Sequence, residues 1–122
     1  MKYILILGIA LLAGTGCAGP PRGIPEIVQS TAEQYLEAWQ EGDWVKIYRL
    51  EEKTPDFSPV LHGALTDQLE SYMINEVRYS DSAAACVLTL HWGTDSGVIT
   101  ETGELYLERS GRRWRIAGFR SY

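Results

Sequence analysis

Every second residue from Ala84 to Trp92 is apolar, which makes this stretch the strongest constraint on the fold of the chain. A two-residue period places alternate side chains on one face of an extended strand, so this strand has one wholly apolar face. Such a face has to be buried against other elements. The pattern therefore predicts a central β-strand in a sheet with one face packed on a core.

Three further strands are expected around it. They cover residues 72–79, 98–109 and 114–122, and the turns between strands are expected at "SDS", "GTDSG" and "SGR". In the third of the four strands Ile99, Leu105 and Leu107 share parity, with Gly103 as an expected bulge between them. Because each turn is short, we predict a four-stranded antiparallel meander.

The first half of the chain has a helical period instead. Apolar residues recur at intervals of three or four from Val28 to Trp39, and Gly42 is expected to end this helix. Asp43 is a suitable N-cap for a second, short helix. A third helix is predicted from Ser58 to about Ser71, because Leu61, Ala64, Leu65 and Leu69 keep the same spacing. The order of elements predicts an α+β fold, with three helices on one face of the sheet.

Two segments resemble the nuclear transport factor 2-like superfamily, also called the cystatin-like α+β roll: "AEQYLEAWQEGDWVKIYRL" and "GRRWRIAGF". The resemblance covers residues 25–122 and rests on these positions: Trp39, Gly42, Asp43, Trp44, Tyr48, Trp114, Ile116, Gly118 and Phe119. It implies helices packed on a curved four-stranded sheet. The superfamily includes ketosteroid isomerase-like enzymes as well as non-enzymatic binding and assembly domains, so the fold alone selects neither.

The amino-terminal segment has the pattern of a signal peptide. After Lys2, residues 3–13 are an unbroken stretch of apolar residues and glycine. As a helix this stretch would be only about 17 Å long, too short for a hydrocarbon core of about 30 Å. The small residues 14–16 and Cys17 that follow are similar to a bacterial lipoprotein signal, although Gly14 stands where that signal prefers Leu, Val or Ile.

The resemblance to a lipoprotein signal implies cleavage before Cys17 and acylation of its sulfur. The expected organisation is then a signal peptide (1–16), a tether with the lipidated cysteine (17–23) and one domain (24–122). The lipid would hold the protein at the cell envelope, and Ala18 implies the outer membrane in a cell with two membranes. Cys86 is expected to be a buried thiol, the alternative being a disulfide with Cys17 in an ordinary secreted protein.

The net charge of −5 makes nucleic acid an unsuitable partner, because an acidic domain binds a phosphate backbone poorly. The charge is uneven: five arginines crowd the carboxyl-terminal region, at positions 109, 112, 113, 115 and 120. Solvent-facing strand positions and a hairpin tip account for them, and an anion site is the alternative.

No catalytic set is recognisable, and no cofactor or metal ligand set is expected. The two histidines lie 29 residues apart with no Cys or Asp cluster around them. Aromatic residues could line a cavity or simply fill the core: Tyr35, Trp39, Trp44, Tyr48 and Trp114. On the other face of the sheet we expect an interface formed by His91, Thr100, Thr102 and Tyr106.

These observations predict a membrane-anchored, non-enzymatic binding or assembly module that engages a second copy or another envelope protein. The alternative is a binder of small apolar ligands, or an isomerase-like enzyme, that uses the aromatic cavity.

Overall fold

The computed structural model describes residues 23–52, 61 and 67–122. The predicted signal peptide and Cys17 lie outside the described residues, and so does all of the predicted tether except Gly23. Of the helices in the described part, none is long and apolar enough to cross a membrane.

The first described helix, α2 (Ile24–Glu41), begins and ends as its sequence predicts. Pro25 lies in the first turn, where its missing N–H costs no hydrogen bond. Gly42 ends the helix in a left-handed conformation with φ of 70°, which glycine adopts without strain. One face of α2 is buried, and its residues are Val28, Ala32, Tyr35, Leu36, Ala38 and Trp39.

The second helix, α3 (Trp44–Glu51), is capped by Asp43, as predicted. The Asp43 carboxylate accepts a hydrogen bond from the backbone N–H of Lys46 at 3.2 Å. Two residues four apart, Ile47 and Glu51, face the interior. Because Ile47 alone of these is apolar, α3 contributes less to the core than α2 does.

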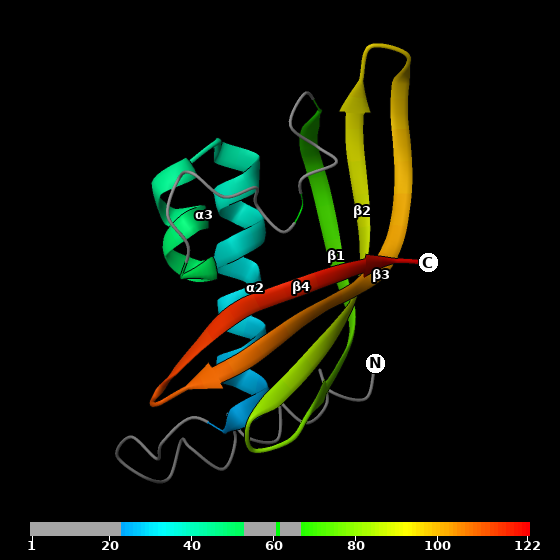
Figure 1. Cartoon of the computed structure of the whole chain (residues 1–122). Coiled ribbons are helices and arrows are strands. Elements are labelled where there is room, and N and C mark those ends of the chain that lie inside the picture. The colour runs from blue at the N-terminus through cyan, green and yellow to red at the C-terminus, as the bar shows by residue number, and fades with distance from the viewer. Residues whose placement is uncertain (1–22, 53–60, 62–66) are drawn as a thin grey trace, which may run out of the picture.

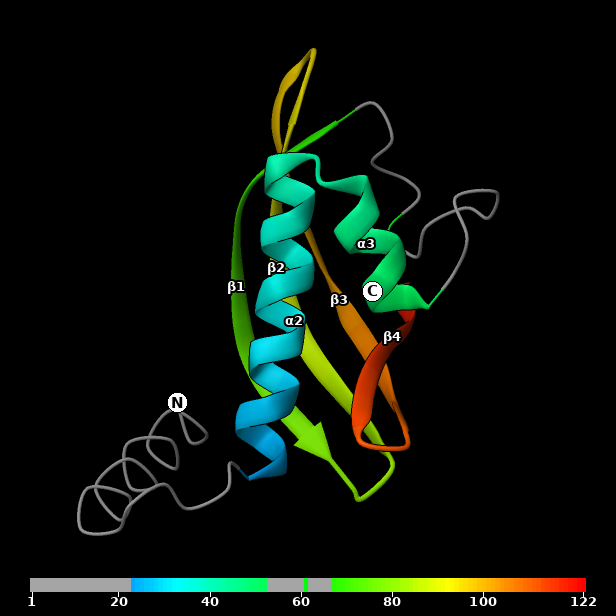
Figure 2. The ribbon, with the colours of Figure 1, turned by 90° about the vertical axis from the view of Figure 1, so that its left-hand side faces the viewer.

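The sheet contains four strands: β1 (Gln68–Tyr79), β2 (Ala83–Thr94), β3 (Gly97–Ser110) and β4 (Arg113–Ser121). Each strand pairs antiparallel with the next in the chain, so the order β1-β2-β3-β4 is the predicted meander. Figure 1 and Figure 2 show both helices on the same side of this curved sheet. An α+β fold with helices on one face of an antiparallel sheet is therefore confirmed.

The core lies between α2 and the sheet. The alternating residues of β2 are its centre: Cys86, Leu88 and Leu90 are completely buried and Trp92 is 3% exposed. Leu105, Leu107 and Ile116 continue the core across β3 and β4. Cys86 is a free thiol, and burial raises its pKa to about 12.

The predicted third helix is wrong at its carboxyl-terminal end. Residues 58–60 and 62–66 lie outside the described residues, but Gln68 to Ser71 belong to β1. The register of β1 against β2 shifts between Leu69 and Ser71 and again between Ile74 and Glu76. The first shift lies inside the predicted helix and interrupts the two-residue period of the strand, so Leu69 could be assigned to a helical spacing with Leu61 and Leu65.

The predicted bulge at Gly103 is also wrong. Gly103 pairs regularly with Leu88 in β2, and the irregularity of this region lies between Tyr106 and Leu107 in the pairing with β4. Gly103 is required for another reason: an added Cβ would lie 2.5 Å from the carbonyl oxygen of Arg120 and 2.6 Å from the ring of Phe119. The glycine allows these groups to approach the strand closely.

The β2–β3 hairpin extends beyond its neighbours. Its pairing continues to Thr94 and Gly97, whereas β1 begins opposite Gly93 and β4 ends opposite Gly103. This extension projects at the top of Figure 1, past the ends of the helices. Ile99 lies on the same face of β3 as the buried residues Leu105 and Leu107. It is nevertheless 52% exposed, because neither helix reaches this part of the hairpin.

Candidate functional site

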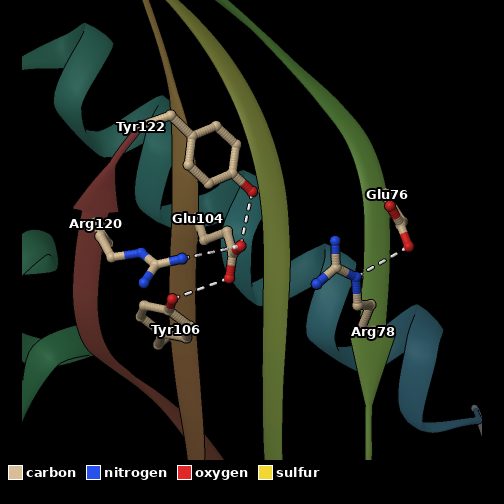
Figure 3. Close-up of polar contacts among 6 residues, drawn as sticks. All are labelled: Glu76, Arg78, Glu104, Tyr106, Arg120 and Tyr122. Carbon is tan, nitrogen blue, oxygen red and sulfur yellow. Dashed lines mark hydrogen bonds and ion pairs between the residues drawn. The ribbon is translucent and has the colours of Figure 1, made fainter.

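The sheet face that turns away from the helices carries an ordered group of polar side chains. No helix of the described residues covers this open face. Its central residues come from β1, β3, β4 and the residue after β4, and we call them the open-face network: Glu76, Arg78, Glu104, Tyr106, Arg120 and Tyr122 (Figure 3). They lie on this face because they alternate with, or follow, the buried residues of the same strands.

Glu104 is the centre of the open-face network. Its carboxylate accepts a hydrogen bond from the Tyr106 hydroxyl at 2.9 Å and another from the Tyr122 hydroxyl at 2.7 Å. Arg120 forms an ion pair with the same carboxylate at 3.8 Å (Figure 3). Only 9% of Glu104 is exposed, although it lies on an uncovered face. The two tyrosines and the arginine therefore surround this carboxylate and hold it in one position.

The hydrogen bonds shift the acidities of all three partners. The two tyrosine hydroxyls, followed by the charges of Arg120 and Arg78, hold the pKa of Glu104 below its ordinary value. Hydrogen bonding to Glu104 raises the pKa of Tyr106 and of Tyr122. At neutral pH the network therefore has a fixed protonation state, with an ionised carboxylate and two neutral hydroxyl donors.

The register of the sheet explains how residues from distant parts of the chain meet here. Glu76, Val87, Glu104 and Arg120 are paired in one row across the four strands. The adjacent row is formed by Arg78, Ala85, Tyr106 and Gly118. Arg78 forms an ion pair with Glu76 at 3.0 Å. In the adjacent row Ala85 lies between Arg78 and Tyr106.

The four predicted interface residues all lie on the open face. His91 and Thr100 are paired across β2 and β3, with 3.1 Å between His91 Nδ1 and Thr100 Oγ1. Tyr106 belongs to the open-face network. Thr102 lies between these two groups, and its carbonyl oxygen accepts the backbone N–H of Tyr122 at 2.9 Å, which directs Tyr122 toward Glu104.

Sequence reasoning missed Tyr122 and Arg120 as members of this group. The irregular pairing between Tyr106 and Leu107 changes which face the residues of β4 take, and a simple two-residue period cannot follow this change. The available signal was the arginine-rich composition of this strand beside the alternating acids of β3. This composition indicated that β3 and β4 carry opposite charges, but it did not specify which residues of the two strands pair.

The predicted cavity residues fall into two groups. Tyr35, Trp39, Trp44 and Tyr48 form one chain of ring contacts, with centroids 5.3–6.4 Å apart. Trp92, which was not among the predicted residues, packs edge-on against Trp39 at 6.2 Å. Trp114 lies elsewhere, beside α3 and the β3–β4 turn, where it lines a separate cleft.

A buried acid lies beside the aromatic group. Glu51 is completely buried and accepts a hydrogen bond of 2.5 Å from the hydroxyl of Tyr35, which is also completely buried. Burial, and then the charge of Glu51, raises the pKa of Tyr35. The hydroxyl is therefore a permanent donor to the carboxylate.

Within residues 23–52, 61 and 67–122, no three His, Cys, Asp or Glu residues are grouped as metal ligands.

The two helices, the curved meander and the position of the open face define a nuclear transport factor 2-like fold. A solved structure with this fold is similar to the chain: an NTF-2-like protein of unknown function from Shewanella oneidensis MR-1, with a TM-score of 0.59 and 16% sequence identity. The similarity covers 79% of this chain and 96% of that one. At this identity the likeness establishes the fold.

The intermembrane-space region of the chloroplast protein ARC6 is also similar, with a TM-score of 0.46, 16% identity, and coverage of 83% of this chain and 98% of that one. No protein-family model and no curated protein sequence matches the chain. The case for a function therefore depends on the chemistry of the described residues.

Proposed function

We propose that the domain is a non-enzymatic binding module of the cell envelope, held at a membrane by a lipid on Cys17, and that its open sheet face binds a second copy of the chain. The observation that carries this proposal is the open-face network. It is an ordered set of donors and acceptors on a sheet face that no described helix covers.

The balance of charge on this face favours a second copy as the partner. The chain as a whole has a net charge of −5, so two copies repel each other in most orientations. The open face instead carries three pairs of an acid with an arginine: Glu76 with Arg78, Glu108 with Arg115, and Glu104 with Arg120. A two-fold interface brings the same patch of both copies together, which requires a surface that is complementary to itself.

The apolar content of the face also suits an interface. Met73 is 56% exposed and is paired with Thr89 on the open face. Val87 lies in the next row of this face and Ala85 in the row after it. A mixture of exposed apolar groups with oriented polar groups is the usual composition of protein interfaces. The hydrogen bonds that Tyr106 and Tyr122 already donate to Glu104 reduce the conformational freedom that these three side chains lose when a partner binds.

Light scattering coupled to size-exclusion chromatography tests the proposed interface. We expect the purified protein to have the mass of a dimer, after subtraction of any detergent, and Tyr106→Glu to have the mass of a monomer. The new carboxylate would lie next to Glu104 in the centre of the interface. Val45→Glu is the matched control, because Val45 is 70% exposed on α3, away from the open face. A wild-type protein that is monomeric at all concentrations contradicts the proposal.

A second candidate function rests on Glu51. A buried carboxylate beside aromatic rings is the kind of group that serves as a general base in an isomerase-like enzyme or that orients a small apolar ligand. Tyr35 already donates to this carboxylate at 2.5 Å, however, and both residues are completely buried. Tyr35 and Glu51 therefore form a hydrogen bond within the core. The open face is the better supported functional site.

A further inference from the structure

A cleft of about 320 Å³ lies where α2, α3 and the β3–β4 turn meet. Figure 2 shows α3 above the β3–β4 turn, on the same side of the sheet as α2. Residues from all three elements line the cleft: Ile27, Thr31, Gln34, Lys46, Arg49, Leu50, Arg112, Arg113 and Trp114. It is on the helix side of the sheet and is separate from the open face.

Four of the described residues that line this cleft are cationic, and none is acidic. Lys46 and Arg49 come from α3, whereas Arg112 and Arg113 come from the hairpin more than sixty residues later. None of the four forms an ion pair with any described residue. The arginines of the open face behave differently, because each of them is paired with a glutamate.

The gathering of these cations needs a physical explanation. Like charges within one cleft repel each other, and no described acid lies among these four. Arg49, Arg112 and Arg113 are exposed, so water screens part of the repulsion. A mobile anion that entered the cleft would supply an opposite charge.

We propose that this cleft is a binding site for a phosphate group. The planar guanidinium of arginine donates two parallel hydrogen bonds to phosphate oxygens, and lysine adds a compact positive charge. The volume is at the small end of the range for ligand pockets, which suits one or two phosphates and excludes a nucleic-acid duplex. Trp114, which is 7% exposed, and Leu50 provide apolar walls for the group that carries the phosphate.

The position of the cleft allows two sources of phosphate. Ile27 lies in the first turn of α2, so the cleft opens near the start of the domain. Gly23 is six positions after Cys17, and an extended chain of this length spans about 20 Å. A lipid on Cys17 would thus bring the cleft close to phosphate headgroups, while a free phosphorylated compound is the other source. The phosphate site itself does not depend on the proposed interface.

Calorimetric titration of the full chain with pyrophosphate tests free phosphate binding, with ionic strength held constant by sodium chloride. We expect saturable binding with one site per chain. Arg49→Gln and Arg112→Gln each remove a charge-assisted hydrogen bond, so each is expected to weaken binding about tenfold. Arg115→Gln is the matched control, because Arg115 lies on the same hairpin but is paired with Glu108.

Co-sedimentation with vesicles tests the lipid source. The full chain carrying Cys17→Ser, which removes the predicted lipid, is mixed with phosphatidylglycerol vesicles or with phosphatidylcholine vesicles. Binding to the first above the second, lost in Arg112→Gln and kept in Arg115→Gln, identifies lipid headgroups as the ligand. Binding of pyrophosphate alone with the same dependence identifies a free phosphorylated compound. The proposal is overturned if neither probe binds, or if binding is equally strong in Arg49→Gln and Arg112→Gln.

Discussion

Glu104 shows how one residue can be ordered on the outside of a sheet. Three groups converge on its carboxylate: the Tyr106 hydroxyl from the same strand at 2.9 Å, and the Tyr122 hydroxyl at 2.7 Å and Arg120 guanidinium at 3.8 Å from the carboxyl-terminal end of the domain. These partners favour the charged carboxylate over the protonated acid, which explains the direction of its pKa shift. The network is consequently sensitive to acid.

The sign of this acid sensitivity follows from linkage. The pKa of Glu104 is lower in the folded state than in the unfolded state, so the unfolded chain binds this proton more tightly. Its contribution to stability is present above the unfolded pKa of about 4.3 and is lost as pH falls through the folded pKa. We expect the melting temperature of the wild type to fall more between pH of about 6 and about 3 than that of Glu104→Gln.

Asp95→Asn is the control for this measurement, since Asp95 is an exposed acid in the β2–β3 turn. It should keep the acid sensitivity of the wild type. Equal losses of melting temperature in the wild type and in Glu104→Gln would show that the network does not stabilise the ionised acid.

At the scale of elements, regular parts of the chain were predictable because their local signals agree with their packing. Gly42 predicted the end of α2, and Asp43 predicted the N-cap of α3. The two-residue period of β2 predicted which of its faces is buried. The start of β1 was not predictable, because the register shift between Leu69 and Ser71 interrupts its two-residue period there. Irregular pairing depends on neighbouring strands, which a local pattern does not contain.

Gly103 provides a test of packing within β3. Gly103→Ala would place a Cβ 2.5 Å from the carbonyl oxygen of Arg120, and backbone cannot move aside as a flexible side chain can. Overpacking of this kind costs about 1–3 kcal/mol, so we expect the free energy of unfolding in urea to fall by that amount.

Gly118→Ala is the matched control for Gly103→Ala. The nearest atom to a Cβ at Gly118 is in the Tyr106 ring at 3.8 Å, which is an ordinary contact. We expect Gly118→Ala to leave the free energy of unfolding unchanged or to raise it by about 0.4–1 kcal/mol. A Gly103→Ala variant as stable as this control would contradict the close approach of β4.

At the scale of the whole molecule, the aromatic helix and the closing strand predicted the roll, and the parity of β2 and β3 predicted which residues share its open face. The basic cleft could not be predicted from spacing. Arg49 and Arg112 are 63 residues apart, and they meet only because α3 and the β3–β4 turn lie at the same end of the sheet. The sequence showed that arginines crowd the carboxyl-terminal region. It did not indicate that Lys46 and Arg49 of α3 lie beside Arg112 and Arg113.

At the same scale, the proposed lipid anchor can be tested through the two cysteines of the chain. We expect radiolabelled palmitate to be incorporated into the wild type and into Cys86→Ser, but not into Cys17→Ser, because acylation needs the thiol of residue 17. Cys86 is completely buried, so it should take up no label itself. Mass spectrometry of the natural protein should find Cys17 at its amino terminus. Label in Cys17→Ser, or a different amino terminus, contradicts the anchor.

The meander has a consequence for how the chain assembles. Every strand finds its partner immediately after a turn of two or three residues: residues 80–82, 95–96 and 111–112. Contacts between chain neighbours require little loop closure, and a sheet built from them has a low contact order. We therefore expect the longest hairpin, β2–β3, to nucleate pairing, and β1, β4 and α2 to add to it afterwards.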